Sequence, residues 1–177
     1  MAHLAIVVNE PMLDVNERTA TSFRSPENEI LPRLDYLCER MNTFIVRRGR
    51  GKTIIAGYPW FLDWGRDTLI AVRGLIANAQ VETATSIIER FAAFEKGGTI
   101  PNAIFGDDDS NRETSDVPLW LAIAIEELAD QTDETFYGQA IDGAGRTYRD
   151  VVLSIAKHYR EGTANGIAMD PESMLIF

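Results

Sequence analysis

Ile55-Ala-Gly-Tyr-Pro-Trp-Phe-Leu-Asp-Trp-Gly-Arg-Asp-Thr-Leu69 is the most informative stretch of this chain, because aromatic, cationic and acidic side chains follow one another closely. Indole faces stack on the C–H face of a sugar ring, while Arg donors and carboxylate acceptors bind its hydroxyls. The glycines and the proline interrupt regular structure until a helical pattern begins at Asp67. The stretch therefore predicts a loop that presents Trp60, Trp64, Arg66 and Asp67 to a neutral polyhydroxyl ligand. The alternative is a buried aromatic corner fixed by an Arg–Asp pair.

Bulk composition limits the partners. The 177 residues, 45% of them hydrophobic, fit one globular domain. A formal charge of −10 argues against nucleic acid and anionic membranes, whose phosphates would be repelled. The single cysteine, Cys38, fits a reduced core residue and a cytoplasmic protein, and the two histidines are too distant in sequence for a His-rich metal site. We expect neither a metal nor a cofactor, and no apolar run is long enough to span a bilayer.

Hydrophobic periodicity predicts a mostly helical chain. A strand is expected at Leu4–Val8, and a helix from Glu29 or Ile30 that runs through Ile45 and closes at Arg47–Lys52. A short β-like run, residues 53–56, leads into the aromatic loop. Further helices are expected over residues 67–79, 81–94, 117–128 and 146–160, with a helical segment at 132–139 and a hairpin after 162.

Two of these helices, residues 67–79 and 117–128, are apolar around most of their circumference, and they alternate with amphipathic ones. Such alternation is typical of two concentric layers of helices. We therefore predict an all-α fold, an incomplete α/α toroid with a few short N-terminal and loop β segments. Residues 1–28 would be an arm or linker, and residues 29–177 the first half of the toroidal domain.

Some site candidates have plain structural alternatives. Asp67 and Asp116 each stand at a helix start, where an N-cap role is common. Asp107-Asp-Asp-Ser-Asn111 fails as a calcium loop, because Arg112 and Pro118 stand where glycine and glutamate are required. Gly49-Arg-Gly-Lys-Thr53 lacks the spacing of a phosphate loop.

Four segments together resemble the amylo-α-1,6-glucosidase domain of glycogen debranching enzymes. They are Met41-Asn-Thr-Phe-Ile-Val46, Gly57 to Ala71, Gly98-Thr-Ile-Pro-Asn102 and Thr114-Ser-Asp-Val-Pro-Leu-Trp120. The resemblance implies an (α/α)6 barrel in which Trp64, Arg66 and Asp67 line the subsite for a terminal glucose, with Asn102 and Asp116 nearby. The chain departs from the family pattern at Arg112-Glu113, where a Tyr-Asn pair is usual. The resemblance therefore does not extend to ligand contacts from these two positions.

The same resemblance leaves the catalytic residues unassigned. The family's general acid and general base lie further along the chain than Phe177, and inversion needs such a pair about 6.5–9.5 Å apart. The resemblance places Asp67 and Asp116 in substrate binding, not in proton transfer. We therefore expect part of a glycogen debranching-type α-1,6-glucosidase that binds an α-glucan and is inactive alone.

Two other functions stay open: a non-catalytic carbohydrate-binding or regulatory module, and a structural helical assembly module. A half-barrel would also expose an apolar face, which predicts self-association or contact with the remaining half of the domain.

Overall fold

The computed structural model describes residues 30–177 except 50, 58–60, 106–107 and 134. The strand expected at Leu4–Val8, the arm over residues 1–28 and the side chain of Trp60 lie outside the described residues. Five α-helices and one two-stranded antiparallel sheet make up the regular structure of the described part. The chain is therefore mostly helical, as predicted, while the incomplete toroid stays a prediction.

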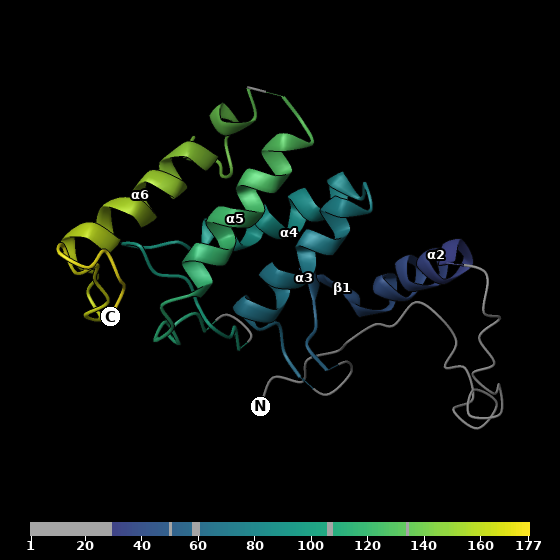
Figure 1. Cartoon of the computed structure of the whole chain (residues 1–177), viewed down its shortest axis with the longest axis horizontal. Helices are drawn as coiled ribbons and strands as arrows, with labels where there is room; N and C mark the ends of the chain where they lie inside the picture. Colours follow the sequence, from purple (N-terminus) through teal and green to yellow (C-terminus); the bar gives the residue numbers. More distant parts are fainter. Residues whose placement is uncertain (1–29, 50, 58–60, 106–107, 134) are drawn as a thin grey trace.

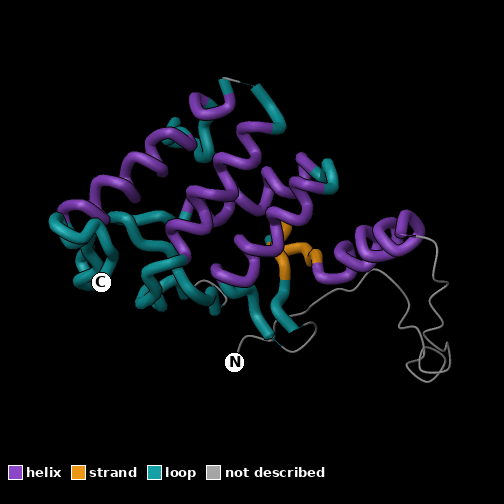
Figure 2. Tube along the Cα trace, in the orientation of Figure 1, coloured by secondary structure: helices purple, strands orange, loops and turns teal. Residues whose placement is uncertain are grey.

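Helices α3 to α6 form one cluster, and α2 lies to one side of it (Figures 1 and 2). The elements are α2 (Ile30–Met41), the 3-10 turn η1 (Asn42–Phe44), β1 (Ile45–Arg48), β2 (Gly51–Ile54), α3 (Gly65–Ala77), α4 (Val81–Ala93), α5 (Val117–Asp130), the 3-10 turn η2 (Phe136–Gly138) and α6 (Tyr148–Glu161). None of the helices in the described part is long and apolar enough to cross a membrane.

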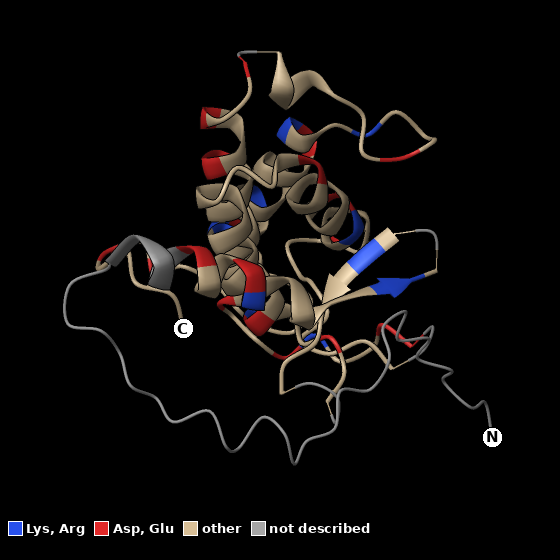
Figure 3. Ribbon diagram, turned by 90° about the vertical axis from the view of Figure 1, so that its right-hand side faces the viewer, with Lys and Arg blue, Asp and Glu red and all other residues tan. Residues whose placement is uncertain are grey.

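The first helix is shorter than the sequence predicts. Helix α2 ends at Met41, and Ile45 begins a strand that pairs with Ile54, so the expected closure of the helix at Arg47–Lys52 is wrong. The β-branched pair Ile45-Val46 favours extended backbone, and Gly49 adopts φ +58°, a left-handed conformation that suits a hairpin turn. The hairpin carries Arg47, Arg48 and Lys52 on its two strands (Figure 3).

Helix α3 is the centre of the core. It packs against both α4 and α5, and Leu69, Val72 and Leu75 are completely buried. Its outer side is not covered by the described residues, because Ile70 is exposed, as is Ile123 on α5. The amphipathic helix α4 buries the stripe predicted for it, including Ile87, Ile88 and Phe91, and matches the predicted range within one residue.

The C-terminal part docks through α6. Its N-cap Thr147 forms a capping box with Asp150, which ends the preceding loop and starts the helix. Buried Tyr148 stacks on Phe136 with ring centroids 4.4 Å apart. The helical segment predicted over 132–139 is reduced to η2, and the chain after Gly162 forms a hairpin in which Ala168 and Phe177 exchange two backbone hydrogen bonds.

Three separate segments meet at Gly65, the first residue of α3. A Cβ atom at this position would lie 2.6 Å from the carbonyl oxygen of Pro101 and 2.8 Å from Cγ1 of Val117. The Gly65 N–H also donates to the carbonyl oxygen of Asn102 at 2.7 Å. The absence of a side chain therefore lets the start of α3, the segment around Asn102 and the start of α5 approach one another.

Gly65→Ala is expected to lower the free energy of unfolding by about 1–3 kcal/mol, because the added methyl overpacks a site closed by backbone atoms. Gly74→Ala, in the same helix, is the matched control. Its Cβ would meet only the flexible Met41 side chain at 3.2 Å, so helix propensity should leave this variant neutral or slightly more stable. Urea unfolding measures both variants, and a Gly65→Ala protein as stable as Gly74→Ala would contradict the prediction.

Candidate functional site

The aromatic loop leads directly into the N-terminus of α3. Trp64 is the N-cap residue in an extended conformation, and its side chain makes no capping hydrogen bond. Arg66 and Asp67 follow in the first turn, where both side chains are exposed. The alternative N-cap role of Asp67 does not apply, because the helix begins at Gly65, two residues earlier than the pattern suggested. A carboxylate in the first turn is still stabilised by the helix dipole.

Arg66 and Asp116 form a two-point ion pair across 50 positions of sequence. Arg66 Nε donates to Asp116 Oδ2 at 2.5 Å, and Nη2 donates to Oδ1 at 2.8 Å. Asp116 occupies the N-cap position of α5, but its carboxylate makes no capping hydrogen bond. The hydrogen bonds from Arg66 instead hold the pKa of the Asp116 carboxyl below its ordinary value. Asp116 is thus an ionised acceptor at neutral pH, and it pairs with the arginine next to Asp67.

Asn102 adjoins this pair through the backbone. Its carbonyl oxygen accepts from Gly65, and its N–H donates to the carbonyl oxygen of Asn111 at 2.6 Å. The side-chain Oδ1 atom is buried and accepts no hydrogen bond from the described residues. Buried acceptors are nearly always paired, which makes this oxygen an exception.

A pocket of about 350 Å³ opens beside the first turn of α3. Arg66 and Asp67 are its charged residues, and the rest of its wall is largely apolar: Met41, Phe44, Ile54, Ile55, Ala56, Gly57, Ile70, Ala71 and Leu75. The volume is at the lower end of the range of about 300–1,000 Å³ that is common for small-molecule sites. Trp64, Asn102 and Asp116 do not line this pocket, so the described candidates adjoin one another without sharing a single cavity.

Sequence reasoning missed the role of Asp63, which is 1% exposed. Arg48 of β1 donates to its Oδ1 atom at 2.8 Å, and the Asp63 carbonyl oxygen accepts from Ile104. This carboxylate therefore ties the hairpin to the aromatic loop and is enclosed. Burial raises the pKa of Asp63, and the nearby Arg48 only partly opposes the rise. The pairing joins positions 15 residues apart, and no local sequence signal reveals it.

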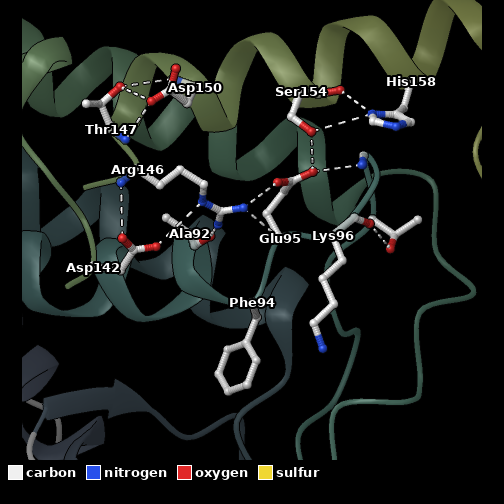
Figure 4. Close-up of polar contacts among 12 residues, drawn as sticks. Ala92, Phe94, Glu95, Lys96, Asp142, Arg146, Thr147, Asp150, Ser154 and His158 are labelled. Atoms are coloured by element: carbon white, nitrogen blue, oxygen red, sulfur yellow. Dashed lines mark hydrogen bonds and ion pairs between the residues drawn. The ribbon is translucent and has the colours of Figure 1, made fainter. Parts of the chain in front are cut away.

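A second enclosed carboxylate, Glu95, holds the turn that precedes Asn102 (Figure 4). Glu95 is 2% exposed, and its Oε1 atom accepts from the Gly98 N–H at 2.7 Å and from the Ser154 hydroxyl at 2.8 Å. Arg146 donates to Oε2 at 3.0 Å, and His158 Nδ1 lies 2.8 Å from the Ser154 carbonyl oxygen. All these contacts come from α6, from Arg146 two residues before it and from the turn after α4. Glu95 is therefore a connecting group, with no free access to a ligand.

Arg112 explains one departure from the family pattern. Its guanidinium donates to the carbonyl oxygens of Phe94 and Thr99, at 2.8 and 3.0 Å, and to Asp109 Oδ2 at 2.7 Å. These bonds fasten the loop after Asn102 to the end of α4. Arg112 thus acts within the protein as a structural clamp. The acidic stretch around Asp109 belongs to this clamp, and no group of metal-binding side chains occurs among the described residues.

The buried Asp63 leads to a pH-dependent prediction. Its folded-state pKa is raised above the ordinary value of 3.8, so its contribution to stability is complete at low pH and is lost as pH rises through the folded-state pKa. Asp63→Asn keeps the shape but does not titrate. The unfolding free energy of the wild type relative to this variant should therefore fall as the pH rises above about 4. Urea unfolding of both proteins at several pH values tests this. If the wild type instead becomes more stable than the variant as pH rises, the attraction of Arg48 outweighs the effect of burial on the pKa of Asp63.

The comparisons with known proteins agree with the motif series. A family model described as amylo-alpha-1,6-glucosidase matches residues 38–177, which include every described candidate residue. No curated protein and no solved structure matches the chain. Because the family model covers most of its length, the chain belongs to the amylo-α-1,6-glucosidase family.

Proposed function

We propose that this chain supplies the glucose-binding end of a glycogen debranching-type α-1,6-glucosidase domain. The ligand is a terminal glucose of an α-glucan, held at the start of α3. The observation that carries the proposal is the Arg66–Asp116 pair, in which Arg66 also lines a pocket together with Asp67. Membership of the amylo-α-1,6-glucosidase family supports the identity of the sugar.

The charges suit a neutral polyhydroxyl ligand. Arg66 offers N–H donors, and the carboxylates of Asp67 and Asp116 offer acceptors, so a sugar hydroxyl can donate and accept at once. Asn102 adds an acceptor that the described protein does not use. Trp64 adds an indole at the N-cap position of the same helix. Trp60 belongs to the same proposed site by its place in the family motif.

The carboxylates in and around this site are poor candidates for proton transfer. A general acid needs a pKa near the working pH, whereas Arg66 lowers the pKa of Asp116. Asp63 and Glu95 are enclosed and bound by Arg48 and Arg146. We therefore propose that the chain binds the glucan. The general acid and the general base of the reaction are residues other than these carboxylates. Glucose release from a branched limit dextrin by the purified chain would overturn this part of the proposal.

The exposed Ile70 and Ile123 support a further part of the proposal: that α3 and α5 meet another helical layer, from a second copy or from the rest of the domain. Sedimentation velocity of the chain alone should show association that increases with protein concentration, and Ile123→Glu should weaken it. A monomer at the highest soluble concentration would contradict self-association.

Binding of isomaltose, which carries the α-1,6 linkage, tests the proposed site. Titration is followed by tryptophan fluorescence and by ligand-observed NMR. Arg66→Ala should weaken binding by at least about tenfold, because charge-assisted hydrogen bonds contribute about 1.5–3 kcal/mol each. Asp116→Asn should weaken it less, since an amide oxygen can still accept.

Arg160→Ala is the matched control, because Arg160 is an exposed arginine near the end of α6. It should bind isomaltose like the wild type. Equal binding by Arg66→Ala and Arg160→Ala would refute the site. Absence of binding by the wild type would instead favour a structural assembly module.

A further inference from the structure

Phe105 is an exposed aromatic residue next to the proposed glucose site, and the proposed function gives it no role. Its side chain is 51% exposed, although it lies only three residues after Asn102. The backbone pairing around Phe105 shows which surface it faces.

Residues 63–65 and 102–104 run side by side in opposite directions. Trp64 and Ala103 form an isolated antiparallel bridge, flanked by hydrogen bonds from Gly65 N to Asn102 O and from Ile104 N to Asp63 O. This is the pattern of a non-hydrogen-bonded pair, in which the two side chains lie on the same face and close together. Trp64 and Ala103 therefore share one face of the paired segments.

Phe105 lies on that same face, because side chains two residues apart in extended chain point the same way. The bridge between Phe105 and Asp108 keeps this part of the chain extended. Trp64 and Phe105 are then diagonal neighbours, with a separation of about 7–8 Å. Along this face Ala103 is completely buried, the Trp64 indole is partly exposed and the Phe105 ring is exposed.

The rim of this face is acidic. Phe105 and Asp108 exchange two backbone hydrogen bonds, at 3.1 and 3.0 Å. Hydrogen bonds from Ser110 lower the pKa of the exposed Asp108 carboxyl, which is therefore ionised at neutral pH. An aromatic face beside a carboxylate acceptor suits a sugar ring with free hydroxyls, and it repels phosphorylated ligands.

We propose that Trp64 and Phe105 form a two-ring platform, on which Trp64 borders the terminal glucose and Phe105 carries the sugar next to it. The inference rests on the proposed function, since the terminal sugar is held by Arg66, Asp67 and Asp116. Phe105 then determines chain-length specificity: the site takes an α-linked oligosaccharide and not a single glucose. The contribution of Phe105 appears only with ligands of two or more sugar units.

The test compares glucose, isomaltose and isomaltotriose on the whole chain. Wild-type affinity should rise from glucose to the longer sugars, and Phe105→Ala should reduce the affinity for isomaltose and isomaltotriose by about three- to tenfold, the range expected for one aromatic contact. Its affinity for glucose should stay unchanged. Phe105→Trp should restore or strengthen binding of the longer sugars, which a merely structural role would not predict.

Phe61→Ala is the matched control. Phe61 is 58% exposed, but its ring covers Gly57, where an added Cβ would lie 2.4 Å from Phe61 Cδ2. The variant should therefore leave the dependence on sugar length unchanged.

Three outcomes would overturn the platform. Phe105→Ala could keep the wild-type dependence of affinity on sugar length, or it could lose affinity for glucose as much as for the longer sugars. Phe61→Ala could show the same selective loss of affinity for the longer sugars. Failure of the proposed function is a different result, because then the wild type binds none of the three sugars. Binding of a Lys-rich peptide that depends on Phe105, without sugar binding, would show a cation-binding face and would also overturn the inference.

Discussion

Close packing at Gly65 is the constraint on which the site depends. A hydrogen in place of a side chain allows the Pro101 carbonyl group, the Asn102 backbone and Val117 to approach the first residue of α3. Three segments that are far apart in sequence thereby converge on one helix start. Arg66 follows Gly65 directly, and Asp116 precedes Val117, so the same contact that closes the core also brings the ion pair together.

Convergence of two helix N-termini explains the electrostatics of the site. The starts of α3 and α5 place the positive ends of two helix dipoles near Asp67 and Asp116. Arg66 binds Asp116 at two points and holds the pKa of its carboxyl below the ordinary value. These hydrogen-bond donors and acceptors are consistent with the proposed role in binding sugar hydroxyls.

Two enclosed carboxylates hold the loops around the site in place. The Arg48–Asp63 pair ties the β hairpin to the loop that delivers Trp64, and Glu95 ties α4 and α6 to the turn before Asn102. Removing one partner of such a buried pair leaves an uncompensated charge, so these contacts hold the loops strongly even if their net stabilisation is small. The loops around the site are thus fixed by groups that do not touch the pocket.

The sequence predicted most helices because their apolar stripes have a clear period, as in α4, and because Pro118 marks a helix start. The prediction was wrong at Ile45, which continues the apolar stripe of the first helix but belongs to a strand. The β-branched residues and the left-handed conformation of Gly49 favour the hairpin there. Motif resemblance identified Arg66 and Asp116, yet could not show that they pair. The Arg48–Asp63 and Glu95–Arg146 contacts connect distant positions, and no pattern within either segment reveals them.

A crystal structure of the chain soaked with isomaltose is the most direct measurement of the central claim. The account predicts electron density for a glucose unit whose hydroxyls contact Arg66 and at least one of Asp67 and Asp116, with Trp64 beside the ring. Density for the sugar elsewhere, with the Arg66–Asp116 pair enclosed by protein and without access to the ligand, would contradict it.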